Sequence, residues 1–214
     1  MLGILCGLES EQMIAAKIKG AIIACAAARP HKARELAQEL VGKGATRLMS
    51  FGIAGSLDSS VNLGDIFIGT RVESKLGHFP CDENWGRQLA DKIPQAKRGG
   101  VYGSEVLVAT IQDKETLFHK TGCAIVDMES QCVAEVARAA NLPMMVVRAV
   151  CDDAKMNVPQ FIMAAIKEDG SVSMTRALKH IARHPLQMSD LFKVGLGTGK
   201  ALAALRAVTT AIGN

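Results

Sequence analysis

Apolar positions in this chain form short runs separated by amphipathic segments. Runs of strand length cover residues 2–7, 21–26, 46–52, 66–72, 99–109, 124–130 and 144–152. Such runs, bounded by Gly or Pro, are typical of strands buried on both faces of a sheet. Residues 30–41 have helical spacing and end at Gly42, and residues 131–140 form a second helical segment before Asn141 and Pro143. The pattern predicts alternating strands and helices.

This alternation predicts the fold class. Strands that alternate with helices favour a mostly parallel sheet with helices on both faces. The 214 residues are 49% hydrophobic and contain no internal repeat or low-complexity linker, so residues 1–214 fit one domain. We predict an α/β domain built on a central mixed, mostly parallel sheet.

Two segments interrupt the pattern. Residues 73–98 are less regular and predict either a lid over a site or an ordinary surface excursion. Residues 195–200 resemble a phosphate-binding loop, but Val194 replaces the first required glycine, Ala201 follows the lysine, and no strand precedes the run. We interpret residues 195–200 as a loop between helices.

Charge and cysteine usage exclude several classes of protein. The formal net charge is +4 and comes from scattered Lys and Arg, and only 4% of residues are aromatic, which argues against nucleic-acid binding. The six cysteines form no C-x-x-C pair, which favours buried thiols in a reducing compartment, so we expect the cytoplasm. Glu9 and Glu11 interrupt the apolar start, so no signal peptide is expected. No membrane span is expected either, because the first candidate, residues 21–28, is short and ends at Arg29-Pro30.

Acidic residues follow three of the predicted strands. Glu129 and Asp152 end the runs 124–130 and 144–152, and Glu11 follows the first strand. In open α/β sheets, ligands bind at the carboxyl edge of the strands. Three acids at that edge favour an enzyme. Structural alternatives are a helix cap by Glu9 or Ser10, and a cap or cation site formed by Asp152 with its neighbour.

Two further motifs are weaker. Phe51-Gly-Ile-Ala-Gly-Ser56 follows a strand, and its small residues, Ala54 and Gly55 among them, allow a ligand close to the backbone. A structural turn explains the run equally well, and the full dinucleotide fingerprint is missing. His180 and His184 have metal-ligand spacing but lack the H-E-x-x-H form, so a solvated helix face is expected and no metal.

Four motifs together carry a family resemblance. They are Gly7-Leu-Glu-Ser-Glu11, Phe51-Gly-Ile-Ala-Gly-Ser-Leu57 with Gly64-Asp65, Val126-Asp-Met-Glu-Ser130 and Val147-Arg-Ala-Val-Cys-Asp152. In order and spacing the chain resembles the purine nucleoside phosphorylase and nucleosidase superfamily. The runs Ser50-Phe-Gly-Ile-Ala-Gly, Asn141-Leu-Pro and Arg183-His-Pro-Leu, with the tail Ala201-Leu-Ala-Ala-Leu205, look like the bacterial hopanoid-associated phosphorylases, a subgroup implicated in removing adenine from adenosylhopane.

The resemblance implies a role for individual residues. Glu129 would bind the ribose hydroxyls while Met128 packs on the sugar, Asp152 would bond the purine N7, and Glu11 matches the acid that orients the attacking water in nucleosidases. Leu107 and Val108 match the segment that lines the base pocket. Two positions depart from the pattern: Ile53 stands where many relatives carry a polar residue, and Ser50 stands where hexameric phosphorylases place a phosphate-binding Arg.

The chemistry agrees with these assignments. Breaking an N-glycosidic bond requires a group that protonates the leaving base and a group that holds the sugar. Apolar surroundings and neighbouring acids would keep Asp152 protonated for the first task. No metal or organic cofactor is needed, and either water or phosphate, as a co-substrate, can attack. If phosphate attacks, Arg29, Arg71 or the backbone amides of 52–55 would have to replace the absent phosphate-binding Arg.

We therefore expect cleavage of an adenine nucleoside that bears a bulky apolar group, by an enzyme that forms a homo-oligomer. The alternatives are an α/β oxidoreductase with a nucleotide cofactor and a non-catalytic nucleoside-binding protein. The C-terminal segment is predicted to be a helix that packs on the core or another subunit, lines an apolar substrate or contacts a membrane surface. Its apolar stripe consists of Leu202, Leu205, Val208 and Ile212, with Lys200 and Arg206 nearby.

Overall fold

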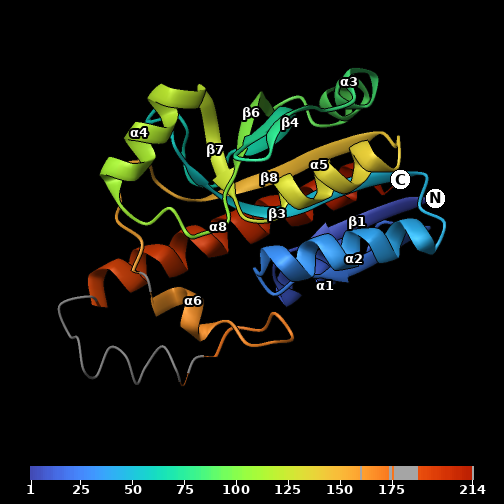
Figure 1. The fold of residues 1–214 in the computed structure, drawn as a ribbon. Helices are drawn as coiled ribbons and strands as arrows, with labels where there is room; N and C mark the ends of the chain where they lie inside the picture. The colour runs from blue at the N-terminus through green and yellow to red at the C-terminus, as the bar shows by residue number, and fades with distance from the viewer. Residues whose placement is uncertain (160, 174, 176–187, 214) are drawn as a thin grey trace.

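Eight strands form one mixed sheet in the computed structural model, which describes residues 1–159, 161–173, 175 and 188–213 (Figure 1). The sheet order is β2-β1-β3-β7-β6-β4-β5, and β8 pairs with both β3 and β4. The strands are β1 (Leu2–Cys6), β2 (Ala21–Cys25), β3 (Arg47–Ser56), β4 (Ile66–Ser74), β5 (Gly77–Pro80), β6 (Lys97–Gly103), β7 (Cys123–Asp127) and β8 (Met144–Asp152).

Most strand pairs are parallel, as the sequence predicts. Five pairs are parallel, and only β3 with β7, β4 with β5 and β4 with β8 are antiparallel. The long strands β3 and β8 lie side by side near the centre, and β8 is buried at almost every position because helices cover both faces. The single α/β domain with a mixed sheet is therefore confirmed.

Helices lie on both faces of this sheet. In Figure 1, α2 and α5 lie together on one face, while α8 crosses the other behind β3 and β8. The helices are α1 (Glu9–Ala15), α2 (Pro30–Gly42), α3 (Glu83–Lys92), α4 (Ile111–Thr121), α5 (Ser130–Ala139), α6 (Phe161–Ala165) and α8 (Met188–Ile212). In the described part of the chain, no helix combines the length and the apolar character that crossing a bilayer requires.

Two local predictions are wrong, and for a third segment the sequence leaves two alternatives open. The expected strand 99–109 ends at Gly103, and the segment up to Thr110 is irregular. For residues 73–98 these alternatives are a lid and a surface excursion. The segment contains β5 and α3, and Asp82 caps α3 by accepting a hydrogen bond from the Trp85 amide at 2.8 Å. None of its residues lines the large cavity described below.

The expected loop at 195–200 is part of α8 instead. Packing explains this outcome, because α8 lies against the end of β8 so closely that a Cβ on Gly197 would come within 2.0 Å of the Cys151 carbonyl oxygen. Only glycine permits that approach, so Gly197 serves helix–sheet contact rather than a turn, while a Cβ on Gly195 or Gly199 would meet nothing within 4 Å. Further along α8, Leu205 and Val208 are buried in the core, which confirms the packing role of the stripe. His180 and His184 lie outside the described residues.

Candidate active site

A cavity of about 710 Å³ lies at the carboxyl ends of β1, β3, β7 and β8. One part of its wall is acidic and is formed by Glu11, Asp127, Glu129 and Asp152. The remainder is mainly apolar and comes from residues 158–172 and from α8, including Phe161, Ile162, Met163, Ile166, Leu191, Phe192 and Leu196. The cavity thus joins a polar, carboxylate-lined end to a long apolar end.

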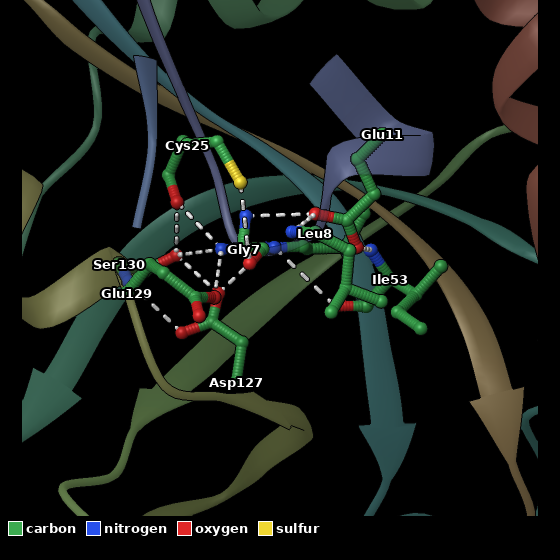
Figure 2. Close-up of polar contacts among 10 residues, drawn as sticks. Gly7, Leu8, Glu11, Cys25, Ile53, Asp127, Glu129 and Ser130 are labelled. Atoms are coloured by element: carbon green, nitrogen blue, oxygen red, sulfur yellow. Dashed lines mark hydrogen bonds and ion pairs between the residues drawn. The ribbon is translucent and has the colours of Figure 1, made fainter. Parts of the chain in front are cut away.

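Glu11 is held in place by the backbone of two different strands (Figure 2). Its Oε2 accepts hydrogen bonds from the amides of Gly7 at 2.7 Å and Leu8 at 2.9 Å, and its Oε1 accepts one from Ile53 at 2.8 Å. Glu11 itself, and not Ser10 or Glu9, therefore satisfies the free amides at the start of α1. Burial raises the pKa of Glu11, although Arg148 and the three amides oppose the shift.

Arg148 is the centre of the acidic end. Its fully buried guanidinium places Nε 2.7 Å from Asp127 Oδ2 and Nη2 3.2 Å from Glu129 Oε2, and Nη2 donates to Ser50 Oγ at 2.6 Å. Ser130 donates to Asp127 through its hydroxyl and, at 3.0 Å, through its amide. A buried arginine requires such partners, and here the charges of the carboxylates exceed its own.

This imbalance changes the ionisation of the cluster. Burial, together with repulsion from Asp127 and Glu11, raises the pKa of Glu129 to about 7, against the attraction of Arg148. Burial would lower the pKa of Arg148, but the surrounding carboxylates raise it above its ordinary value. Arg148 therefore stays charged, and Glu129 exchanges its proton near neutral pH.

Three glycines make room for three carboxylates. A Cβ on Gly7 would lie 2.7 Å from Glu129 Oε1, one on Gly52 would lie 2.6 Å from Glu11 Oε2, and one on Gly55 would lie 2.8 Å from an oxygen of Asp152. Each distance is shorter than a Cβ contact allows, so any larger residue would displace the acid. A shift in the pairing of β3 with β8 sets Gly55 opposite Asp152.

Asp152 has a direct partner of opposite charge. Its Oδ1 accepts a hydrogen bond from the ammonium of Lys114, which is fully buried on α4. The sequence predicted acidic neighbours for Asp152 and missed this cation. Asp152 ends a strand and does not cap a helix, and the cation at the Asp152-Asp153 corner is this ammonium group. In the described residues, no group of three or more acidic, His or Cys side chains is arranged to hold a metal.

The remaining predicted residues divide into two groups. Met128, Ala54, Gly55 and Leu107 line the cavity. Val108 lies beside it in a small apolar cluster with Leu57, Cys123 and Val126.

No arginine or lysine lines the cavity within the described part of the chain. Arg71 donates to Glu73 and to the Thr121 carbonyl, and Arg29 lies 4.0 Å from Glu168. Ser50 is buried against Arg148 and is also absent from the wall. The proposed replacements for a phosphate-binding arginine therefore do not reach the cavity, and only backbone groups at 53–55 do.

Sequence reasoning missed Asp127, Arg148 and Lys114. Arg148 carried a readable signal, because an arginine inside the apolar run 144–152 must find buried acidic partners. Asp127 lies two residues before Glu129, on the same strand end. The sequence does not distinguish Lys114 from an ordinary surface lysine. The other lysine of the same helix, Lys120, is indeed exposed.

Residues 17–183 match the sequence profile of a family described as the phosphorylase superfamily. This match covers well over half of the chain. The chain belongs to the phosphorylase superfamily. Membership agrees with the mixed sheet and with the position of the carboxylates at strand ends.

A curated relative is the 5′-methylthioadenosine/S-adenosylhomocysteine nucleosidase of Staphylococcus aureus strain JH9. It is 24% identical over 144 residues, which cover 55% of this chain and 63% of the relative. The chain thus spans about three fifths of the length of the curated relatives that it matches.

Several solved structures match more of the chain. A 5′-methylthioadenosine/S-adenosylhomocysteine nucleosidase from Neisseria meningitidis, in complex with methylthio-immucillin-A, has a TM-score of 0.75 and 12% identity, and covers 99% of this chain and 97% of its own. The futalosine hydrolase of Helicobacter pylori strain 26695 has a TM-score of 0.67 and 16% identity, with 86% and 97% covered. At these identities the likeness concerns the fold.

Proposed function

We propose that this protein hydrolyses the N-glycosidic bond of an adenine nucleoside. The observation that carries the proposal is the convergence of Glu11, Glu129 and Asp152 on one cavity. The nucleosidase named among its relatives acts on adenine nucleosides, and membership of the phosphorylase superfamily makes this reaction class the natural one.

Asp152 serves the base in this proposal. When the C1′–N9 bond breaks, its electron pair stays with the purine, and Asp152 gives a proton to N7. The carboxyl group lies at the cavity wall, and the absence of a side chain on Gly55 leaves room for it there.

Glu129 serves the sugar. An ionised Glu129 accepts hydrogen bonds from two ribose hydroxyls, and half-buried Met128 beside it packs on the sugar ring. Arg148 Nη2 donates to Oε2 of this carboxylate at 3.2 Å, which fixes its position at the cavity wall. As the sugar gains positive charge, the surplus of carboxylates stabilises it.

Glu11 serves the water. Its Oε2 accepts hydrogen bonds from two backbone amides, whereas Oε1 accepts one and can accept another from a water. A water bound there loses a proton to Glu11 as its oxygen bonds to C1′. The cavity wall, with its carboxylates and without a cation among the described residues, disfavours a phosphate dianion, so we favour water over phosphate.

The substrate carries a bulky apolar group in this proposal, of the adenosylhopane type. Most residues that line the cavity are apolar, and Val172, Phe192 and Leu196 among them leave 51%, 73% and 52% of their surfaces exposed. Exposed apolar residues bordering a cavity suit an apolar substituent that extends outward.

The test is release of free adenine, followed by chromatography, from adenosine, 5′-methylthioadenosine and an adenosine with a long 5′-alkyl chain. We expect adenine from all three and the highest kcat/KM for the long chain. Binding without release would favour a nucleoside-binding protein, and nicotinamide absorbance changes without adenine would favour an oxidoreductase.

A further inference from the structure

Lys114 is a buried lysine whose role the proposed reaction leaves open. Its side chain has no exposed surface and lies on α4 behind Asp152, outside the cavity wall. Burial of an ammonium group is costly unless it is paired and hydrogen-bonded, so its position requires an explanation.

Three acceptors surround the ammonium nitrogen. Lys114 Nζ donates to Asp152 Oδ1, to the Asp153 carbonyl at 2.7 Å and to the Met156 carbonyl at 3.1 Å. An ammonium has three donors, and all three are used. Lys114 therefore has no donor left for a substrate, and it can influence the reaction only through Asp152 and the segment after it.

The surrounding structure fixes Lys114 in this place. Thr110 caps α4 by accepting from the Asp113 amide, the Ile111 amide donates to Asn157 Oδ1 at 3.0 Å, and the Val158 amide donates to the Ala109 carbonyl at 2.8 Å. The start of α4 and the segment after β8 are thus joined around the ammonium group. This joint holds the cation next to Oδ1 of Asp152, while Oδ2 accepts a hydrogen bond only from the weak donor Cys151 Sγ, at 3.4 Å.

We propose that Lys114 is a positioning residue that stabilises Asp152 as it loses its proton to the base. The inference rests on the proposed function. In the step, the O–H bond of Asp152 breaks, the N7–H bond of the purine forms, and the electron pair stays on the carboxylate. The Lys114 ammonium remains protonated throughout. The step starts from the complex in which Asp152 carries the proton. From that state, the ammonium attracts the carboxylate more strongly than the carboxylic acid, so it stabilises the negative charge that develops on Asp152 as the proton moves to N7.

A purely structural Lys114 would make a different prediction. If the side chain only joins α4 to β8, its loss would slow every substrate equally. If it assists proton transfer, its loss would slow only substrates whose leaving group needs the proton. The nature of the leaving group therefore separates the two roles.

The experiment compares adenosine with 4-nitrophenyl β-D-ribofuranoside, whose leaving group departs as a stable anion. Lys114→Met removes the charge at similar volume, and Lys114→Gln removes it but keeps donors for the two carbonyls. Lys97→Met is the matched control, because Lys97 pairs with Asp65 on the surface. Circular dichroism and Tm establish that each variant folds.

We expect both Lys114 variants to lose about 10–10²-fold in kcat on adenosine, which is only part of the roughly 10²–10⁴-fold that a general acid contributes, and less than about threefold on the nitrophenyl riboside. In an Asp152→Asn background, Lys114→Gln should add almost nothing, because the two residues act as one unit. Lys97→Met should match the wild type.

Equal losses on both substrates, additive losses in the double variant, or failure of both variants to fold would overturn the inference and leave Lys114 a structural residue. The proposed function would survive those results. It fails separately if the wild-type protein releases no adenine.

Discussion

Arg148 Nη2 lies 3.2 Å from Glu129 Oε2, in a buried cluster where Asp127 and Glu11 also face the guanidinium. One cation cannot neutralise these carboxylates, so the pKa of Glu129 rises to about 7. Only the ionised form accepts hydrogen bonds from ribose hydroxyls without competition from its own proton.

We therefore predict that kcat/KM for adenosine falls as pH decreases through about 7. Protonation of Glu129 removes the hydrogen-bond acceptor for the ribose hydroxyls, and this loss produces the acidic limb of the pH–rate profile. Glu129→Gln should raise KM, lower kcat and abolish this limb, and it should remove the preference for adenosine over 2′-deoxyadenosine. A variant with an unchanged limb and unchanged preference would exclude the sugar role.

Replacement of the base-side acid should affect turnover more than folding. Asp152→Asn keeps the shape of the side chain but cannot donate a carboxyl proton to N7, so we predict a loss of about 10²–10⁴-fold in kcat. Steady-state adenine release measures this loss, and Tm reports whether the fold is intact. Near wild-type turnover would make Asp152 a structural acid.

The close contact of Gly55 with Asp152 gives a test of positioning. A methyl group at position 55 would lie 2.8 Å from a carboxylate oxygen, so Gly55→Ala should displace Asp152 and reduce kcat about 10²-fold. Gly42→Ala is the matched control, because a Cβ there meets nothing within 4 Å. Equal activity of the two variants would show that the carboxylate tolerates displacement.

Two positions on α8 should separate packing from substrate contact. Leu205 is fully buried, so Leu205→Ala should lower the free energy of unfolding by about 2–5 kcal/mol. Phe192 lines the cavity with most of its surface exposed, so Phe192→Ser should leave stability within about 0.5 kcal/mol. Phe192→Ser should lower kcat/KM for a long 5′-alkyl adenosine and leave kcat/KM for adenosine unchanged. Equal effects on the two substrates would show that Phe192 does not contact the alkyl chain.

Much of this architecture is readable from sequence because buried parallel strands leave a plain apolar pattern. The strand ends that present Glu129 and Asp152, and the acid after β1, follow from that pattern and the usual position of ligands in α/β sheets. The errors have one physical source, which is tertiary packing. Gly197 sits in a helix because β8 lies against it, a contact that glycine frequency alone does not reveal.

The polar partners of the site divide in the same way. Arg148 could have been assigned a buried acidic neighbour, because its strand is otherwise apolar. The pairing of Lys114 with Asp152 joins residues far apart in the chain and depends on how α4 meets the segment after β8. No local pattern encodes that meeting, so only the structure reveals it.

The most direct test of the account measures adenine and the sugar product together, with and without phosphate. With adenosine and purified protein, we predict adenine and free ribose at a rate that phosphate does not change, and Glu11→Gln should reduce that rate by at least about 10²-fold. Phosphate-dependent formation of ribose 1-phosphate would contradict attack by water, and the absence of adenine under every condition would contradict the proposed function itself.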